Sequence, residues 1–503
     1  MTHITIKDRP CGWGKSTEIF SSYKAGEKYI TVLPFLSEVD RAVKRAASES
    51  KHIMYAPVDT QGSKTDHVTD LIKAGKSVAC THALFFRLGT LATTKTGETL
   101  DIVGLLSDAH NLKVSHTEHF LLDDFHVIID EAIDPFNTVN TVTPNDFQKD
   151  YVELGLVEVC PDGKISPTGL WDTRYRDGGQ TFDRSLYEQA KSGALYTVQG
   201  KLFVLTIPTE LMLRPKSVTI YTYLSGGTVL LKFMQRLQQQ LSDTSDAFTL
   251  EVDRLAPVDE AAWRQDVSRA LLINSIPALE SYNWSYSKQL ATFSKSGGKV
   301  AARRVGMALK HWAGKELAAT HKGTVMLTCA RDLWCGSANT QQPMAGPLAK
   351  DSRLFGNAVR EYDEAGFADG WSTTGVKFVA NTTRGVNDYI LCGTAIYLYD
   401  QHPNPNVTLF LGMPKGSKAE REFSDAYALS ELVQWLFRSC IRSGGMNSVP
   451  SDIRPRRKAV VYIPSARMRN LLINWLATGE VCSMDRKAFP TSPKTSTSER
   501  VAA

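Results

Sequence analysis

A glycine-rich turn near the start of the chain carries side chains suited to phosphate binding. Residues 10–17 read Pro-Cys-Gly-Trp-Gly-Lys-Ser-Thr, after a short apolar run and before a helical pattern. In such a turn, glycines let backbone N–H groups close around phosphates, a lysine reaches the outer phosphates and a hydroxyl ligates Mg²⁺. The sequence therefore predicts a nucleoside-triphosphate site formed by Gly12, Gly14, Lys15, Ser16 and Thr17.

The turn departs from the usual phosphate-loop pattern at one position. A glycine or another small residue normally precedes the second glycine by five positions, and here that position is Arg9. The alternative interpretation is a glycine-rich turn whose Lys15 simply faces solvent.

An acidic pair ends the most apolar run of the first half. Residues 125–129 are followed directly by Asp130 and Glu131. Taken alone, such a pair is more often a solvated turn. A phosphate loop, however, needs a carboxylate on a neighbouring strand, so we predict a Walker B arrangement. In it, Asp130 would hold Mg²⁺ through water and Glu131 would polarise the attacking water.

The elements that must position these residues read as a parallel α/β sheet, because short β-like runs alternate with helical patterns. We expect strands at 29–33, 53–55, 77–80, 125–129 and 217–223, and helices at 38–46, 68–74 and 230–241. The continuous apolar character of the fourth strand implies cover on both faces. Hairpin signals at Asp162-Gly163 and Gln199-Gly200 indicate an insertion over about 138–215.

A second α/β series follows in the last third of the chain. It predicts strands at 324–328, 377–380, 394–399 and 459–463, and helices at 424–442 and 467–477. A length of 503 residues already favours two or three domains. We predict a first lobe over 1–235, a mostly helical connection over 236–319, a second lobe over 320–480 and a disordered tail over 485–503.

Composition narrows the class of protein without naming a partner. With 42% hydrophobic and 22% charged residues, the chain is typical of globular proteins. A net charge of +5 is too small to indicate a polyanionic partner by itself. The 8 cysteines form no CxxC pair, which favours reduced thiols and no structural zinc. The N-terminus lacks a signal-peptide pattern and no run of about 18 apolar residues occurs, so we expect a cytoplasmic protein without a membrane segment.

The Asp-Glu-Ala segment at 130–132 resembles motif II of superfamily 2 helicases of the DEAD/DEAH-like type, and other segments resemble further motifs of that family in order. They are 29–41 for motif Ia, 78–84 for the later nucleic-acid-contacting segment, 222–228 for motif III, 325–331 for motif IV, 380–388 for motif V and 434–442 for motif VI. A Thr-Arg-Gly-Val-Asn-Asp run together with the Arg-Met-Arg run near 465–470 most resembles phage-encoded helicase-like proteins.

The resemblance implies two RecA-like parallel-sheet lobes in tandem, with ATP and Mg²⁺ bound between them, and placement in the host cytoplasm if phage-encoded. It implies further ATP contacts at Arg384 and Gly385, catalytic roles for Gln434, Arg438 and Arg442, and coupling roles for Thr222 and Ser225. Single-stranded or duplex DNA or RNA would be held mainly through its phosphates. The implied nucleic-acid contacts are Pro34, Arg41, Thr81, His82, Arg331 and Thr383.

Motif VI departs from the family pattern, because Arg438 and Arg442 stand four residues apart where three is usual. On a helix both spacings leave the side chains on one face. We expect Arg442 to be the arginine finger and Arg438 a ground-state phosphate contact. A solvated basic helix face is the alternative.

Two basic runs stand outside these motifs. Arg303–Lys310 is an amphipathic stretch that could follow a phosphate backbone, and Arg454–Lys458 is a denser cluster, although most such runs are solvated faces.

The functional prediction is an ATP-dependent helicase or translocase. Two alternatives stay open: a nucleotide-gated nucleic-acid clamp with weak ATPase activity, and a protein-remodelling ATPase.

Overall fold

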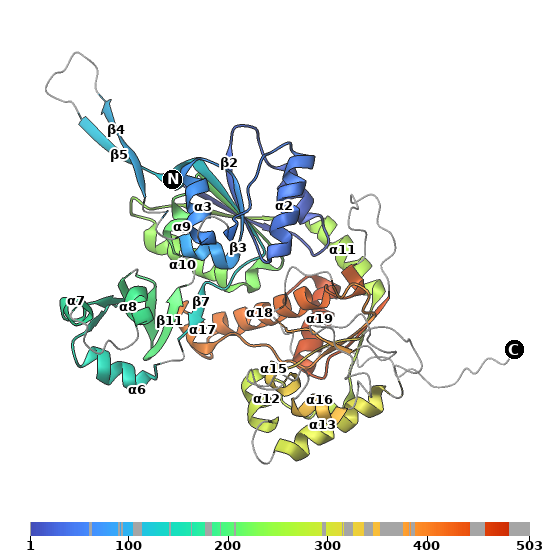
Figure 1. Cartoon of the computed structure of the whole chain (residues 1–503). Helices are drawn as coiled ribbons and strands as arrows, with labels where there is room; N and C mark the ends of the chain where they lie inside the picture. Colours follow the sequence, from blue (N-terminus) through green and yellow to red (C-terminus); the bar gives the residue numbers. More distant parts are fainter. Residues whose placement is uncertain are drawn as a thin grey trace.

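The computed structural model places two α/β lobes in tandem, with a smaller subdomain beside the first (Figure 1). The structure describes residues 2–59, 63–88, 91, 94–103, 113–139, 142–161, 163–176, 184–191, 193–205, 208–293, 298–313, 315, 325–335, 346–352, 376–381, 383, 388–442 and 458–481.

The first lobe is built on a parallel sheet with the strand order β13-β1-β12-β6-β2-β3. In chain order, the strands are β1 (His3–Asp8), β2 (Lys28–Leu33), β3 (Val78–Thr81), β6 (Phe125–Asp130), β12 (Ser217–Thr222) and β13 (Thr249–Arg254). Because all six run the same way, the ends of β1, β6 and β12 meet at one edge of the sheet. Both candidate motifs of the first lobe therefore lie at that edge.

Helices cover both faces of this sheet, as its apolar central strands require. Alternate residues of β6 point to opposite faces: Val127 and Ile129 join one core, and Ile128 joins the other. The first core is covered by α3 (Lys64–Lys73) and α10 (Val229–Leu241), and the second by α1 (Lys15–Ser21) and α2 (Leu36–Glu49). Short helical segments complete the lobe: α4 (His82–Phe85), η2 (Phe86–Leu88), η3 (Leu121–Asp124), α9 (Glu210–Leu213) and η5 (Ser225–Gly227).

Two segments leave the first lobe between its strands. One is a long antiparallel hairpin of β4 (Lys95–Val103) and β5 (Lys113–Phe120), which projects from the lobe (Figure 1). The other, between β6 and β12, forms the inserted subdomain with its own core around Trp171. Its elements are β7 (Phe136–Thr138), α6 (Pro144–Phe147), a π-helical turn (Gln148–Val152), β8 (Val157–Val159), β9 (Ile165–Pro167), α7 (Gly169–Arg176), α8 (Arg184–Lys191), β10 (Leu195–Val198) and β11 (Lys201–Leu205).

The second lobe has a parallel sheet with the strand order β14-β18-β17-β15-β16. Its strands are β14 (Leu271–Asn274), β15 (Val325–Thr328), β16 (Val376–Phe378), β17 (Thr394–Tyr397) and β18 (Ala459–Tyr462). One face packs against α11 (Pro257–Ala270), α18 (Lys418–Leu436) and α19 (Ala466–Thr478), and the other against α12 (Tyr286–Phe293), α13 (Gly298–Trp312), α15 (Arg331–Trp334) and α16 (Pro347–Ser352). Short α17 (Pro405–Phe410), η6 (Pro277–Leu279) and η9 (Cys440–Arg442) complete the lobe.

The predicted α/β class with two parallel-sheet lobes in tandem and an insertion in the first is confirmed. The Gln199-Gly200 signal does mark a hairpin, since both residues have positive φ between β10 and β11. Residues 236–319, expected as a connection, instead add β13 to the first sheet and β14 to the second. The strand expected at 53–55 is reduced to one bridge between Tyr55 and Val78.

The helix expected to run through Arg442 ends earlier. Phe437 caps α18, and the N–H groups of Arg438 and Ser439 each donate three residues back, at 3.0 Å, to Trp435 and Leu436. Such tight turns break the helical ladder. The expectation that Arg438 and Arg442 share one helical face is therefore wrong. The tail expected over 485–503 lies outside the described residues.

Within the described segments, each helix is too short or too polar to cross a bilayer.

Candidate nucleotide site at the lobe interface

The predicted phosphate loop follows β1 and turns sharply into α1. Gly12 and Gly14 have φ angles of 82° and 93°, in the left-handed region that glycine adopts without a Cβ clash. The Trp13 N–H donates to the Pro10 carbonyl at 3.2 Å, and the Glu18 N–H donates to the Gly14 carbonyl at 3.0 Å. The first turn of α1 thus opens at the carboxyl edge of the first sheet, where backbone N–H groups can meet a phosphate.

Lys15 lies against the acidic pair at the end of β6. Its Nζ is 3.2 Å from Glu131 Oε1, with only 10% and 9% of the two side chains exposed. Burial by itself would lower the pKa of Lys15, but the charges of Glu131, Cys11 and Asp130 outweigh it and raise that pKa. Burial and the Glu131 charge raise the pKa of Asp130 to about 6, against the opposing charge of Lys15. Strongly perturbed groups gathered at a sheet edge are typical of functional sites.

The backbone at Glu131 is strained. Its φ is 70°, although it carries a side chain, and its N–H donates to the Tyr221 carbonyl at 2.9 Å. A left-handed non-glycine residue costs on the order of 1–3 kcal/mol, and such residues gather at active sites. Here the turn brings the carboxylate of Glu131 onto Lys15.

The two predicted coupling residues contact the chain just before the phosphate loop. Asp8 Oδ2 accepts hydrogen bonds from the Ser225 N–H at 3.0 Å and from the Ser225 hydroxyl at 2.6 Å. The carbonyl of Thr222 accepts from the Arg9 N–H at 2.9 Å. Movement of the segment after β12 is therefore linked directly to the base of the phosphate loop.

Helix α18 of the second lobe lies on this same segment. Gln434 Nε2 donates to the Tyr223 carbonyl at 3.3 Å and to the Ser430 hydroxyl at 3.0 Å. A Cβ built on Gly227 would overlap the Ala426 carbonyl, so only glycine allows the helix this close. Gln434 is 2% exposed. The structure thus places it as a contact between the lobes.

The two arginines of the predicted finger lie in different surroundings. A Cβ built on Gly12 would stand 3.5 Å from the Arg442 carbonyl oxygen and 3.9 Å from Arg442 Cγ. Arg442 of the second lobe therefore lies on the phosphate loop of the first. Arg438 is 3% exposed. Of the two, Arg442 has the position that suits a group supplied across a lobe interface.

Tyr223 is a residue of this interface that the sequence did not single out. It is 2% exposed and inserts among aromatic side chains of the second lobe, with ring centroids 5.4 Å from Trp263 and 6.3 Å from Trp475. Its hydroxyl donates to Glu260 at 3.3 Å. In the sequence, only the position of Tyr223 between the predicted coupling residues Thr222 and Ser225 could have indicated this role.

The oxygen groups at this edge fit a magnesium ion that is shared with a nucleotide. Ser16 follows Lys15 in the first turn of α1, and Asp130 ends β6. Mg²⁺ prefers such hydroxyl and carboxylate oxygens and usually completes its shell with water and phosphate. In the part of the chain that the structure describes, no group of three or more His, Cys, Asp or Glu side chains could hold a metal by protein ligands alone.

A groove of about 490 Å³ lies beside the phosphate-loop edge, where α2, α3 and α4 begin. Arg87 contributes positive charge to it, Lys64 forms an ion pair of 3.2 Å with Asp59 in its lining, and Thr81, a predicted nucleic-acid contact, lines it. The hydroxyl of Thr81 also accepts from the Leu84 N–H at 3.3 Å, which caps α4. The remaining lining residues are Leu36, Val39, Pro57, Asp59, Ser63, Thr65, Cys80, Ala83 and Leu84.

The other predicted nucleic-acid contacts are dispersed. His82 Nε2 lies 2.9 Å from the Asp130 carbonyl oxygen, so it faces the acidic strand end. Arg41 forms an ion pair with Glu38 on the same helix. Pro34 is half-buried before α2, and Arg331 is exposed at the start of α15. The Thr383 N–H donates to the Ala380 carbonyl at 2.9 Å, whereas Arg384 and Gly385 lie outside the described residues.

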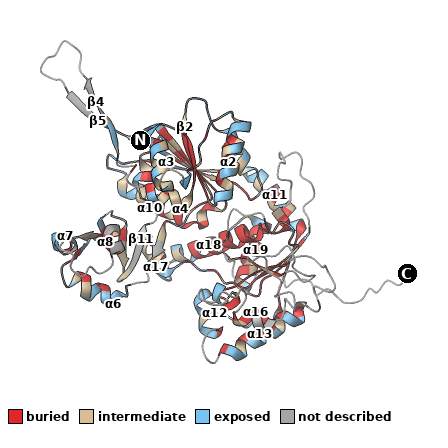
Figure 2. Cartoon of the chain, viewed as in Figure 1, coloured by how far each residue is buried: buried red, intermediate tan, exposed pale blue. Residues whose placement is uncertain are grey.

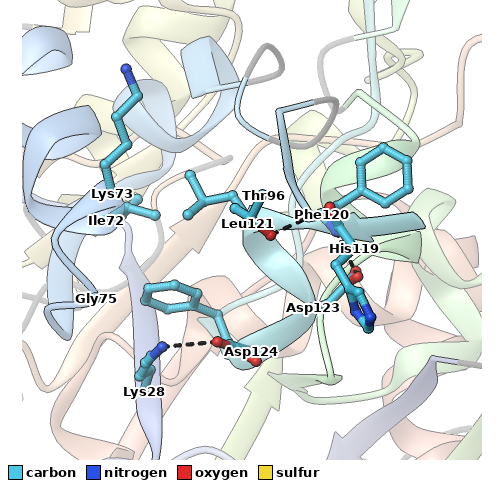
Figure 3. A pocket seen from close by; sticks show the side chains of 11 residues that line it. Lys28, Ile72, Lys73, Gly75, Thr96, His119, Phe120, Leu121, Asp123 and Asp124 are labelled. Carbon is cyan, nitrogen blue, oxygen red and sulfur yellow. Dashed lines mark hydrogen bonds and ion pairs between the residues drawn. The ribbon is translucent and has the colours of Figure 1, made fainter. Parts of the chain in front are cut away.

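A second hollow, of about 320 Å³, lies at the opposite edge of the first sheet, where β2 and β6 begin (Figure 3). Lys28 and Asp124 form an ion pair of 2.9 Å across its rim. Since the phosphate loop and Glu131 lie where strands end, this hollow is separate from the candidate site.

Comparison with known proteins finds a family model that matches part of the chain. Residues 291–476 match the family model described as YonV C-terminal Rossmann-like domain. The SPbeta prophage-derived uncharacterized protein YonV of Bacillus subtilis (strain 168) is 33% identical over 99 residues, which are 20% of this chain and 20% of that protein. The match therefore spans about a fifth of the length of this curated relative.

Three solved structures are similar over most of this chain. S. tokodaii Xpd4 is 12% identical, with 95% of this chain and 94% of that chain covered and a TM-score of 0.42. Mss116p bound to ssRNA and AMP-PNP is 10% identical, with 96% and 70% covered and a TM-score of 0.34. S. cerevisiae Dbp5 bound to RNA and ADP BeF3 is 9% identical, with 94% and 82% covered and a TM-score of 0.33. At these identities, the similarity concerns only the general path of the backbone.

Proposed function

We propose that the chain is an ATP-driven nucleic-acid motor, a helicase or translocase of the superfamily 2 type. The observation that carries this proposal is the juxtaposition of three parts at one interface. Lys15 lies 3.2 Å from Glu131 inside the first lobe, and Arg442 of the second lobe lies against Gly12 of the same phosphate loop. A nucleotide bound there would contact both lobes, so its hydrolysis can alter how the lobes are held together.

The proposed chemistry is phosphoryl transfer to water. When a nucleotide binds, Lys15 would exchange its ion pair with Glu131 for one with the phosphates. The Glu131 carboxylate would then be available to orient and polarise the attacking water. Asp130 and Ser16 would hold Mg²⁺, which neutralises charge on the phosphates. Arg442 would stabilise the charge that develops at the outer phosphate when the lobes close.

Coupling to movement would pass through the segment after β12. Ser225 is bound to Asp8 beside the phosphate loop, and Gln434 of α18 is bound to the Tyr223 carbonyl two residues earlier. A change at the nucleotide therefore has a short hydrogen-bonded route to the second lobe. Nucleic acid would lie in the groove that Thr81, Lys64 and Arg87 line, held through its phosphates.

The proposal is tested by ATP turnover with and without single-stranded DNA or RNA. We expect strong stimulation by one of them in the wild type and no turnover in Lys15→Ala, because the lysine is assigned to phosphate and not to the core. Lys24→Ala, at an exposed lysine of the same lobe, is the matched control. Hydrolysis by folded Lys15→Ala at the wild-type rate would remove the phosphate-loop assignment. Turnover indifferent to nucleic acid would favour a protein-remodelling ATPase.

A nucleotide-gated clamp is the second candidate, and the spacing of the two arginines favours it. Helix α18 ends at Leu436, so Arg438 and Arg442 do not share a helical face, and a single arginine would complete the site. Tight nucleic-acid binding that depends on ATP but proceeds with little hydrolysis would identify the clamp.

A further inference from the structure

The exposed face of α13 is basic, with five basic side chains beside two apolar ones, Val300 and Met307. The helix reads GKVAARRVGMALKHW and contains no acidic residue. Its exposed side chains include Lys299, Arg303, Arg304, Lys310 and His311, and Figure 2 shows the exposed stretches of α13 along the outer surface of the second lobe. The five side chains span about 18 Å along the helix axis at about 1.5 Å per residue.

The opposite face of α13 is fixed in the protein. Ala302, Val305, Leu309 and Trp312 are buried against the second sheet, in the core that also holds Val325 and Leu327. This core lies on the other side of the sheet from α18, which contacts the first lobe. The basic face is therefore held rigidly outward and away from the nucleotide site.

These charges weaken the helix that carries them. Lys299 lies in the first turn, where the helix dipole disfavours cations, and it stands four residues before Arg303, a repulsive spacing. Only Lys310 and His311, in the last turn, gain from the dipole. Among the described residues, none of the ion pairs includes one of the five side chains. Helix stability thus does not account for Lys299, Arg303 and Arg304.

We propose that this face of α13 is a second nucleic-acid contact, which binds the phosphate backbone outside the groove of the first lobe. The proposal rests on the proposed function, since it assumes that the chain binds nucleic acid at all. A row of cations with no carboxylates between them matches a row of phosphates. An anionic membrane fits less well, because a helix that lies on a bilayer needs a broad exposed apolar face. On α13 only Val300 and Met307 are large exposed hydrophobic side chains.

Two consequences follow from the position of α13. Because the helix is remote from the phosphate loop, it should raise nucleic-acid affinity without changing the chemical step. Because α13 is remote from the groove of the first lobe, it should contribute to binding only when a strand is long enough to reach both the groove and α13. Arg303 and Arg304 stand at the centre of the row and should contribute most.

The test is nucleic-acid binding by a variant that combines Lys299→Ala, Arg303→Ala, Arg304→Ala and Lys310→Ala. Fluorescence anisotropy would be measured at several salt concentrations with a long and a short single strand. Removing up to four phosphate contacts should lower the slope of log K against log salt by up to about 3, at about 0.7 per contact. We expect at least about a tenfold loss of affinity for the long strand at low salt and no change for the short one.

The matched control removes the same charge elsewhere, with Lys24→Ala, Lys76→Ala, Lys415→Ala and Lys418→Ala, all exposed positions. Equal losses in the two variants would show that only net charge matters and would overturn the proposal. If the fourfold variant did not fold, as judged by its ATPase activity without nucleic acid, Arg303→Gln with Arg304→Gln would be used. If that folded variant showed an unchanged slope of log K against log salt, the proposal would also be overturned.

The remaining outcomes separate this proposal from the proposed function. If the wild type bound neither strand, the proposed motor function would be contradicted, and α13 would have no role in nucleic-acid binding. A wild type that binds the short strand, with long-strand affinity unaffected by the α13 substitutions, keeps the motor and removes the α13 surface. Loss of binding to vesicles that contain phosphatidylserine, with nucleic-acid binding intact, would assign the face to a membrane instead.

Discussion

The two lobes meet at two places built on different principles. Beside the nucleotide site, backbone and polar groups of α18 lie on the segment from Tyr223 to Gly227, with Gln434 bound to a carbonyl. Farther away, Phe410 of α17 inserts among aromatic rings of the insertion in the first lobe, with ring centroids 4.9 Å from Phe136 and 5.4 Å from Tyr196. Arg236 lies 4.8 Å over the ring of Phe410 and also donates to its carbonyl.

The first contact can transmit a structural change at the nucleotide site to the second lobe. The second contact mainly holds the two lobes together. Hydrogen bonds to carbonyls and a glycine against a backbone are directional, so a small shift at the nucleotide side alters them. The second contact has one such hydrogen bond, from Arg236 to the Phe410 carbonyl, but consists mainly of aromatic packing, whose burial of apolar area depends less on exact geometry. We therefore expect substitutions at the first contact to change turnover and substitutions at the second to change stability.

The largest effect is expected at the arginine that reaches the phosphate loop. Arg442→Ala should lower kcat by a factor on the order of 10³ with little change in ATP affinity, since a finger acts on the transition state. Steady-state ATPase kinetics with saturating nucleic acid would measure it.

Arg438→Ala is the paired variant for this prediction. Because Arg438 is only 3% exposed, we expect its loss mainly to raise KM or to lower stability. If both alanine variants kept full nucleic-acid-stimulated turnover, the second lobe would not complete the site.

The next largest effect is expected at the glycine of the first contact. Gly227→Ala adds a Cβ that overlaps the Ala426 carbonyl, which should push α18 off the coupling segment. Misplacement of about 1 Å can cost a factor on the order of 10² in rate. We expect a kcat loss of that order with ATP binding to the first lobe preserved, measured by turnover and by a fluorescent nucleotide.

Gly226→Ala is the control, because a Cβ there meets nothing within 4 Å. Equal activities of the two variants would mean that the close approach of α18 has no part in coupling.

The smallest effect on turnover is expected at the second contact. Phe410→Ala removes a half-buried ring and should lower the free energy of unfolding by about 1–3 kcal/mol. Its kcat should stay within about twofold of the wild type, since the ring touches neither nucleotide nor coupling segment. Chemical denaturation and ATPase assays together check this. A large kcat loss without destabilisation would erase the distinction between the two contacts.

What the sequence predicted well depends on local pattern. Strands such as β6 are continuous apolar runs, and the phosphate loop combines glycines with a lysine, so both could be located without a structure. The half-polar edge strand β13 was missed because edge strands lack that continuity. The end of α18 was placed too late, since the residues after Leu436 remain compatible with a helix.

Contacts between distant segments lay beyond reach of the sequence. The positions of Tyr223 among the tryptophans of the second lobe and of Phe410 among the aromatics of the first are set by how the lobes pack. Periodicity within one helix or strand carries no information on that packing. The same holds for the hydrogen bond from Gln434 to the Tyr223 carbonyl, which joins the lobes.

We propose that Glu131 activates water for attack on a phosphate held by Lys15. Single-turnover hydrolysis and equilibrium binding of ATP by Glu131→Gln test it most directly, because the amide keeps the shape of the side chain but cannot act as a base. The variant should bind ATP and nucleic acid as the wild type does and hydrolyse at least about 100-fold more slowly. Hydrolysis at the wild-type rate would contradict the claim and require another carboxylate as the base.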